Sequence, residues 1–247
     1  MQLGIIGLGK LGGGIARRLL RHNHEPVGFD RAPDEVADLE AAGGGGARSY
    51  EALVAALEPP RHLWLMVPAG PVVDAVLEEV IPHLDPGDCI VDGGNSFYKD
   101  SVKRAEACRE KHGLHYVDCG VSGGVWGLDG GFCLMVGGAD EAVDRLRPVF
   151  EALAPAPDQG WAHLGPSGAG HFTKMVHNGI EYGLMQAYAE GFALLDSKAE
   201  FGLDLHRISE IWQHGSVIRS WLLELTERAL HDDASLADVA PFVQDSG

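Results

Sequence analysis

The sequence has few cysteines, and no two of them stand at metal-binding spacing. Its four cysteines are scattered along residues 89–133 without a C-x-x-C pair, at Cys89, Cys108, Cys119 and Cys133. A zinc cluster or a disulfide framework needs cysteines in a regular, close pattern, so this distribution argues against both. We therefore expect reduced thiols, no metal site and a cytoplasmic protein.

Long apolar runs and an excess of positive charge are also missing. No apolar stretch approaches the roughly 18 residues that a membrane span needs, and Met1 leads directly into a strand-like run without a signal segment. Lys and Arg number 19 against 36 Asp and Glu, which gives a net charge of −17. Such a surface repels nucleic acids and anionic lipids, so we expect neither as a partner.

The composition is otherwise that of a globular protein. Apolar residues make up 45% of the 247 and charged residues 22%. At about 150 residues per domain, this length predicts one large domain or one domain with a smaller companion.

From residue 1 to about 150, short apolar runs alternate with helix-like segments, which predicts βαβ units and a parallel sheet. The expected strands are Leu3–Ile6, Pro26–Phe29, Leu63–Val67, Cys89–Val91, His115–Val117 and Cys133–Val136. The expected helices are Ile15–Arg21, Glu51–Leu57, Val72–Leu84, Val102–Lys111 and Glu141–Leu153. The four-glycine run Gly43–Gly46 is interpreted as a turn.

The pattern becomes helical after a proline-rich break at Ala154–Pro157. Trp161–Leu164 is expected as a last short strand. The remaining segments have helical periodicity and no strand signal, and we expect helices over Ser167–Asp196, Asp204–His214 and Ser216–Leu230.

A glycine-rich turn, Gly7–Gly12, follows the first strand and opens the first helix. In a dinucleotide-binding turn, Gly7 would allow the tight turn, Gly9 the approach of a pyrophosphate and Gly12 close helix–strand packing. The predicted cofactor contacts in this turn are Gly7, Leu8, Gly9, Lys10, Leu11 and Gly12. We expect an α/β fold, with a Rossmann-type domain at residues 1–165 and an all-helical substrate and oligomerisation domain at residues 166–247.

Asp30 provides a second sign of a dinucleotide site. It lies eighteen residues after Gly12 and ends the expected strand Pro26–Phe29, where an acidic residue binds the adenosine ribose. Its charge would repel a 2′-phosphate, which favours NAD over NADP. The adjacent Arg31 could pair with that phosphate, so NADP remains possible.

The first long helix carries an unusual polar stripe. Lys174, His177, Asn178, Glu181 and Tyr182 stand at i, i+3, i+4, i+7 and i+8 and therefore share one face. We expect a buried helix with this one polar stripe, because glycine-rich helices usually pack closely. The alternative is the solvent-facing side of an amphipathic helix.

The stripe can be interpreted chemically in two ways. A metal could bind His177 and Glu181 with His171 as the third ligand, but Lys174 would compete with the metal. In the interpretation that we prefer, Lys174 beside a nicotinamide acts as a general base, because burial favours its uncharged amine. Glu181, about 10 Å further along the axis, would be a separate acid.

Three motifs resemble one known family. The segment Gly170–Gly183 resembles the signature of decarboxylating 6-phosphogluconate dehydrogenase, and Asp92–Ser96 and Val121–Gly124 match two further motifs in the same order. The likeness runs from residue 3 to about 230. The segment around Lys174 is highly specific, whereas the others occur across the β-hydroxyacid dehydrogenase superfamily.

The resemblance implies oxidative decarboxylation of 6-phospho-D-gluconate to ribulose 5-phosphate and CO2, with NAD or NADP, in pentose phosphate or gluconate metabolism. It implies that Lys174 takes the hydroxyl proton while hydride leaves C3, and that Glu181 then protonates C1 of the enediol. The substrate-binding residues that it implies are Asn95, Ser122, Gly123, Gly124, His177 and Asn178, with Tyr182 and Arg219 at the phosphate. The implied cofactor loops contribute Val67, Pro68, Ala69 and Asn95.

The sequence also departs from the long members of that family. Val125–Leu128 stands where they carry acidic residues, which is similar to a short bacterial form. Long members bring C-terminal residues from a neighbouring subunit to the substrate, whereas this chain ends at Gln244–Gly247 in what looks like mid-segment. We expect a homodimer or homotetramer.

Two other functions stay open. One is a non-decarboxylating dehydrogenase of the 3-hydroxyisobutyrate or tartronate semialdehyde type, against which Glu181 and Arg219 argue. The other is a non-catalytic nucleotide-sensing protein, against which Lys174 and Glu181 argue.

Overall fold

A computed structural model describes residues 1–240 of the chain. The chain forms two compact units, the first ending at Met175 and the second beginning at Val176. The expected chain end at Gln244–Gly247 lies outside the described residues.

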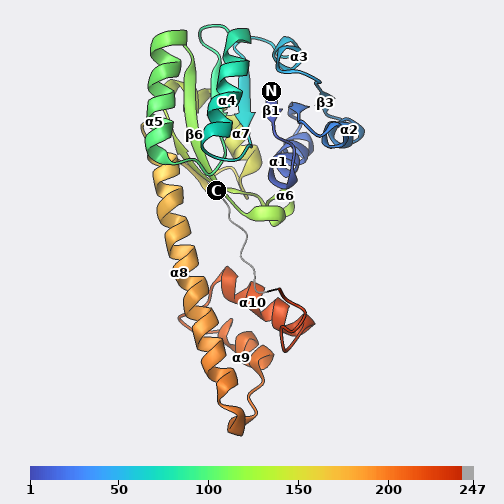
Figure 1. Cartoon of the computed structure of the whole chain (residues 1–247), viewed down its shortest axis with the longest axis vertical. Helices are drawn as coiled ribbons and strands as arrows, with labels where there is room; N and C mark the ends of the chain where they lie inside the picture. The colour runs from blue at the N-terminus through green and yellow to red at the C-terminus, as the bar shows by residue number, and fades with distance from the viewer. Residues whose placement is uncertain (241–247) are drawn as a thin grey trace. The chain divides into compact units, whose positions relative to one another are not determined.

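The first unit is built on an eight-stranded sheet with the order β3-β2-β1-β4-β5-β6-β7-β8 (Figure 1). All neighbouring strands are parallel except β6 and β7. The strands are β1 Gln2–Ile6, β2 Glu25–Phe29, β3 Gly45–Gly46, β4 His62–Leu65, β5 Cys89–Asp92, β6 His115–Ser122, β7 Cys133–Gly137 and β8 Trp161–Gly165.

Helices connect these strands. They are α1 Lys10–Arg21, α2 Pro33–Ala41, α3 Tyr50–Ala55, α4 Pro71–Val80, α5 Tyr98–Ala107, α6 Gly127–Gly130 and α7 Asp140–Leu153. Short turns of 3-10 helix lie at Ile81–His83 and Gly124–Trp126, and a π-helical turn at Cys108–His112 continues α5.

The central strands β1, β4 and β5 of the sheet are buried on both faces. Leu3 and Ile5 of β1 belong to a core cluster that includes residues of α1 and α7. Ile6 of the same strand belongs to a second cluster that includes residues of α3 and α4. Successive side chains point to opposite faces, so helices cover both sides of the sheet. The expected α/β fold is confirmed.

Two expectations for the first unit were wrong. Gly45 and Gly46 do not belong to a turn but form the edge strand β3, which pairs with Val27 and Gly28. A Cβ on Gly46 would lie 2.2 Å from Oε1 of Glu40, so a larger residue there would displace that exposed side chain.

The second error concerns strand direction, because β6 and β7 are antiparallel rather than parallel. Only residues 123–132 join these strands. A parallel crossover needs a dozen or more residues, so a connection this short returns the chain in the opposite direction.

The second unit is helical. Helix α8 runs over Ala169–Ser197, beginning in the first unit, and is followed by a 3-10 turn at Ala199–Phe201, α9 at Leu205–Trp212 and α10 at Trp221–Asp232. Phe192, Leu223 and Leu230 are its buried core. Among residues 1–240, no helix is long and apolar enough to cross a membrane.

The last helix is shorter than the sequence pattern predicts, because it begins at Trp221 instead of Ser216. The side chain of Ser220 accepts a hydrogen bond from the backbone N–H of Leu223 and so caps the helix. Residues 216–219 therefore form a loop, and Arg219 belongs to that loop.

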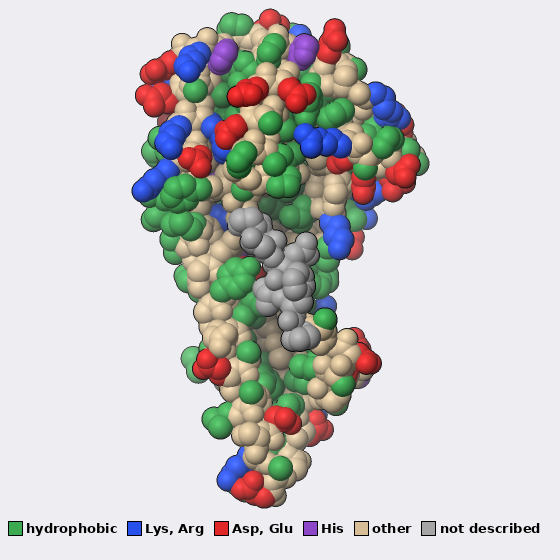
Figure 2. All heavy atoms as spheres, in the orientation of Figure 1, with side chains coloured by type: hydrophobic (Ala, Val, Ile, Leu, Met, Phe, Trp, Pro, Cys, Tyr) green, Lys and Arg blue, Asp and Glu red, His purple; other side chains and the backbone are tan. Residues whose placement is uncertain are grey.

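Lys and Arg side chains are interspersed among acidic ones on the face drawn in Figure 2. Exposed ion pairs of the first unit include Arg48–Glu40 and Arg147–Asp144. Each such pair contributes at most about 1 kcal/mol to stability.

Candidate active site

The turn after β1 has the shape of a phosphate cradle. Gly7 has φ +92°, and a Cβ there would lie 2.3 Å from the carbonyl oxygen of Met66. A Cβ on Gly12 would lie 1.9 Å from the carbonyl oxygen of Gly7, whereas one on Gly9 would meet nothing within 4 Å. Gly7 and Gly12 thus permit close packing of backbone against backbone, and the space beside Gly9 is unoccupied by other residues.

The N-terminus of α1 that follows this turn has no side-chain cap and no acidic residue in its first turn. Backbone N–H groups at a helix N-terminus attract anions, and the helix dipole adds to that attraction. The turn and the helix end therefore suit the pyrophosphate of a dinucleotide.

Asp30 joins the end of β2 to this turn. Its Oδ2 accepts a hydrogen bond of 2.6 Å from the backbone N–H of Leu8, and its Oδ1 accepts one of 2.8 Å from that of Ala32. The carboxylate is partly buried, while the neighbouring Arg31 is exposed. Asp30 therefore supports the turn through the backbone of Leu8, and its remaining lone pairs can accept hydroxyl donors.

The loops after β4 and β5 lie against each other. A Cβ on Gly93 would lie 2.2 Å from Nε1 of Trp64, and one on Gly94 would lie 3.0 Å from the carbonyl oxygen of Val67. Glycine is therefore required where the Asp92–Ser96 loop crosses the Val67–Ala69 loop. The half-buried Asn95 follows directly.

A buried carboxylate, Asp92, holds that loop. It accepts hydrogen bonds from the hydroxyls of Ser96 and Tyr116, at 2.7 and 2.8 Å, and from the backbone N–H of Gly94 at 3.1 Å. Arg104 lies 3.7 Å away and forms an ion pair with it. Burial and the charge of Asp92 raise the pKa of the Tyr116 hydroxyl, which keeps it a hydrogen-bond donor.

The end of β6 presents backbone to solvent. Ser122 and Gly123 are half-buried and Gly124 is exposed. Gly123 and Gly124 have φ values of +127° and +53°, which a residue with a side chain rarely adopts. Glycine is therefore favoured at both positions, where the chain leaves β6.

The start of α8 is fixed to the sheet through Asp118, a fully buried residue of β6. Its Oδ1 accepts a hydrogen bond of 2.6 Å from the backbone N–H of Gly168, and its Oδ2 accepts one of 2.8 Å from that of His171. Nδ1 of His171 lies 2.7 Å from Oγ of Ser101, which adds a second tie. These contacts satisfy N–H groups that a helix start leaves without partners.

Lys174 lies one turn further along α8 and is only 9% exposed. A Cβ added to Gly120 would lie 2.3 Å from its Cβ, so its aliphatic stem rests on β6. Cys133 of β7 is close enough that the charge of Lys174 opposes the rise in the Cys133 pKa that burial causes. Lys174 is therefore a largely buried lysine whose stem lies against the sheet.

The remaining residues of the stripe lie in the second unit, on the same continuous helix. Nδ1 of His177 lies 3.1 Å from Oδ1 of Asn178 and 3.6 Å from Oε2 of Glu181. His177, Asn178 and Glu181 are half-buried, and Tyr182 is exposed.

The expectation that α8 is a buried helix was wrong for the single chain. Met175, Val176 and Ile180 have exposures of 44%, 44% and 62%, greater than those of the polar side chains of Lys174 and Glu181. Apart from the exposed Tyr182, the polar stripe is thus the more covered face, and an apolar face is open.

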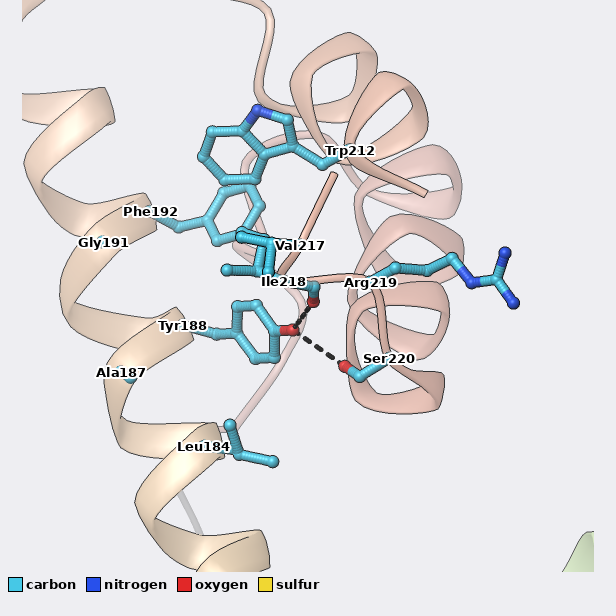
Figure 3. A pocket seen from close by; sticks show the side chains of 10 residues that line it. All are labelled: Leu184, Ala187, Tyr188, Gly191, Phe192, Trp212, Val217, Ile218, Arg219 and Ser220. Atoms are coloured by element: carbon cyan, nitrogen blue, oxygen red, sulfur yellow. Dashed lines mark hydrogen bonds between the residues drawn. The ribbon is translucent and has the colours of Figure 1, made fainter. Parts of the chain in front are cut away.

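Arg219 does not lie on a helix but in the loop before α10. It lines an apolar cavity of about 460 Å³ within the second unit, but its guanidinium points away from the other lining residues (Figure 3). The hydroxyl of Tyr188 contacts the carbonyl of Ile218 and Oγ of Ser220, which fixes the loop on either side of Arg219.

Sequence reasoning missed the supporting residues Asp118, Gly120 and Tyr116, and quoted Asp92 without giving it a role. A charged residue inside an apolar strand, as in Val117-Asp118-Cys119, was the available signal. Such a carboxylate must find buried donors, which the sequence does not identify.

Comparison with known families agrees with the motifs. Residues 2–165 match the NAD binding domain of 6-phosphogluconate dehydrogenase, and residues 170–201 match the C-terminal domain of that enzyme. The chain is 52% identical over 244 residues to the NAD(+)-dependent, decarboxylating 6-phosphogluconate dehydrogenase of Haloferax volcanii, covering 98% of this chain and 80% of that one.

Solved structures show the same relationship. The 6-phosphogluconate dehydrogenase of Plasmodium falciparum superposes with a TM-score of 0.86 at 30% identity, over 97% of this chain and 54% of that one. The 3-hydroxyisobutyrate dehydrogenase of Salmonella typhimurium gives 0.78 at 28% identity, over 94% and 79%. The family resemblance inferred from the motifs is confirmed, and the chain belongs to the 6-phosphogluconate dehydrogenase family.

Proposed function

We propose that the protein oxidises and decarboxylates 6-phospho-D-gluconate to ribulose 5-phosphate and CO2 while reducing NAD. The observation that carries this proposal is the buried Lys174 against β6, on a helix that also bears Glu181 seven residues on. The relative from Haloferax volcanii is described as NAD(+)-dependent and decarboxylating.

Residues of the first unit would bind the cofactor. The open side of Gly9 and the uncapped start of α1 favour the pyrophosphate, and Asp30 would accept the ribose hydroxyls. The further proposed contacts come from Leu8, Lys10, Leu11, Arg31, Val67, Pro68, Ala69 and Asn95. NAD supplies the hydride acceptor, and NADP is the weaker alternative because Asp30 repels a 2′-phosphate.

Lys174 would act first, as the base that takes the C3 hydroxyl proton while hydride leaves C3. The protonated amine then polarises the new carbonyl, which accepts the electron pair that CO2 leaves behind. Glu181 protonates C1 of the resulting enediol. Glu181 lies seven residues further along α8, about 10 Å along the helix axis. The two proton transfers, at the C3 hydroxyl and at C1, can therefore be served by two separate groups.

Further polar groups of the chain would hold the substrate. Ser122, Gly123 and Gly124 offer a hydroxyl and a partly exposed backbone. Asn95, His177 and Asn178 would bind the sugar acid, and Tyr182 and Arg219 the phosphate. A guanidinium suits bidentate phosphate binding.

We expect a homodimer or homotetramer. The apolar side of α8 supports this, with Ile180 at 62% and Leu194 at 72% exposure, because large apolar patches usually mark interfaces. Light scattering on the eluting protein would measure the mass, and a monomer would contradict the expectation.

A spectrophotometric assay tests the activity. The pure chain is offered 6-phosphogluconate, gluconate and 3-hydroxyisobutyrate with NAD and with NADP, and both reduced cofactor and CO2 are measured. We expect equal amounts of NADH and CO2 from 6-phosphogluconate, and no NADH from Lys174→Ala, which still binds NAD. Turnover of 3-hydroxyisobutyrate without CO2 would instead establish the non-decarboxylating activity, and normal turnover by Lys174→Ala would remove the base assignment.

A further inference from the structure

Three possible metal ligands meet in the second unit, apart from the proposed catalytic residues. They are His206 of α9 and Glu227 and His231 of α10. Glu227 and His231 stand four residues apart and share one face of their helix. One ligand atom of each of the three lies within 4.8 Å of the others. Nε2 of His206 is 2.8 Å from Oε1 of Glu227, and the two imidazole rings are 5.1 Å apart.

The two helices that carry these side chains are firmly placed within the unit. Helices α9 and α10 lie side by side (Figure 1), and Leu223 and Leu230 of α10 are buried between their neighbours. The side chains of Asp204 and Ser220 cap α9 and α10. The backbone positions of the three ligands are therefore set by packing.

We propose that His206, Glu227 and His231 form a binding site for a divalent transition metal of the zinc class. Imidazole nitrogens suit Zn²⁺ and its neighbours, whereas Ca²⁺ and Mg²⁺ prefer oxygen ligands alone. Two histidines and one glutamate make three protein ligands, which leaves a fourth tetrahedral position for water.

Metal binding would require only a small movement of the three ligand side chains. Ligand bonds of about 2.0–2.1 Å in a tetrahedron place ligand atoms about 3.3 Å apart. His206 and Glu227 are already 2.8 Å apart. His231 is the exposed member of the group, so its ring can rotate toward the other two.

Such a metal would join α9 to α10. The buried apolar core of the second unit, among its described residues, is Phe192, Leu223 and Leu230. Small cores commonly need a metal or a covalent link for stability. We therefore expect the metal to stabilise this unit.

Calorimetric titration of the full, untagged, metal-stripped chain with ZnCl₂ tests the site. We expect one Zn²⁺ per chain, at least tenfold weaker binding by His231→Ala and by Glu227→Gln, and unchanged binding by the control His214→Ala, which removes an exposed histidine of the same unit. The thermal midpoint should rise with Zn²⁺ in the wild type and the control, but not in His231→Ala. Absence of saturable binding, or full binding by both cluster variants, would overturn the proposal.

Cobalt supplies an independent readout. Co²⁺ bound by two imidazoles and a carboxylate gives visible d–d bands without thiolate charge-transfer absorption. We expect those bands in the wild type and their loss in His231→Ala. Thiolate absorption would assign the binding to a cysteine such as Cys133 and would also overturn the proposal.

Discussion

Gly120 of β6 lies directly against the stem of Lys174, and a Cβ on Gly120 would be 2.3 Å from Cβ of the lysine. The same added atom would lie 3.3 Å from the carbonyl oxygen of Gly170. The start of α8 thus approaches the sheet as closely as a residue without a side chain permits. The position of the proposed base depends on that glycine.

Gly120→Ala should therefore impair catalysis more than cofactor binding. The methyl group has to displace Lys174 or α8, at a cost of about 1–3 kcal/mol in stability. We expect kcat to fall at least tenfold while the Kd for NAD stays within about twofold, because misplacing a reacting group by about 1 Å costs about a hundredfold. Steady-state kinetics and cofactor titration measure both.

The matched control is Gly130→Ala. A Cβ on Gly130 meets nothing within 4 Å, so this variant should keep the wild-type kcat. A wild-type kcat in Gly120→Ala as well would show that the contact does not position the base.

Asp118→Asn tests the hydrogen bonds that join the start of α8 to the sheet. Asparagine offers one acceptor oxygen, so it cannot accept from the backbone N–H groups of both Gly168 and His171 as the carboxylate does. A buried N–H left without a partner costs about 1–3 kcal/mol. We expect a loss of this size in urea unfolding together with a lower kcat, whereas Asp158→Asn in an exposed loop should change neither. Unchanged unfolding in Asp118→Asn would contradict the capping role.

The sequence predicted those features whose determinants are close together in the chain. The Gly7–Gly12 turn and Asp30 belong to one short βαβ unit, so their spacing was informative. Asp118 was not predicted because its partners, Gly168 and His171, stand about fifty residues further on. A single sequence without structure does not say which distant donors a buried carboxylate meets.

Helix α8 and the loop at Arg219 show two further features that the sequence pattern does not determine. Periodicity correctly placed Lys174 and Glu181 on one helix, but it does not state which face is covered, since that depends on neighbouring chains as well. Arg219 was assigned to a helix because helical periodicity predicted one over Ser216–Leu230. The capping bond of Ser220 decided the boundary, and helix boundaries are less certain than helix existence.

Cofactor selectivity should depend on Asp30. Its carboxylate accepts from Leu8 in the glycine turn and would also bind the adenosine ribose. Asp30→Ala removes both interactions, so we expect the Kd for NAD to rise at least tenfold and that for NADP to rise less, since the repulsion of the 2′-phosphate is also removed. Fluorescence titration with each cofactor measures the two constants.

Asp30→Asn separates the two roles. The amide oxygen can still accept from Leu8, so the turn is retained while the negative charge is lost. We expect a shift toward NADP in this variant as well. Equal fold-changes for NAD and NADP in both variants would remove Asp30 from the selectivity argument.

His62 of β4 should make stability depend on pH. It is 7% exposed, and its Nε2 has no hydrogen-bond partner within the described residues. Burial, followed by the charge of Arg145, lowers its pKa from 6.5 to about 4. The folded chain therefore keeps this imidazole neutral at a pH where the unfolded chain already binds a proton.

The difference in the His62 pKa between the folded and the unfolded chain sets the direction in which stability changes with pH. Above pH 6.5 neither state is protonated at His62, and stability is unaffected. As the pH falls from 6.5 toward 4, the unfolded state gains protons first, so the free energy of unfolding decreases, by about 2 kcal/mol between pH 7.5 and pH 5. In His62→Leu this part of the decrease should disappear, whereas the control His83→Leu, at an exposed position, should keep it. Urea unfolding of the three proteins at both pH values measures the effect. An equal decrease in all three would mean that His62 is already protonated, or solvated, in the folded chain.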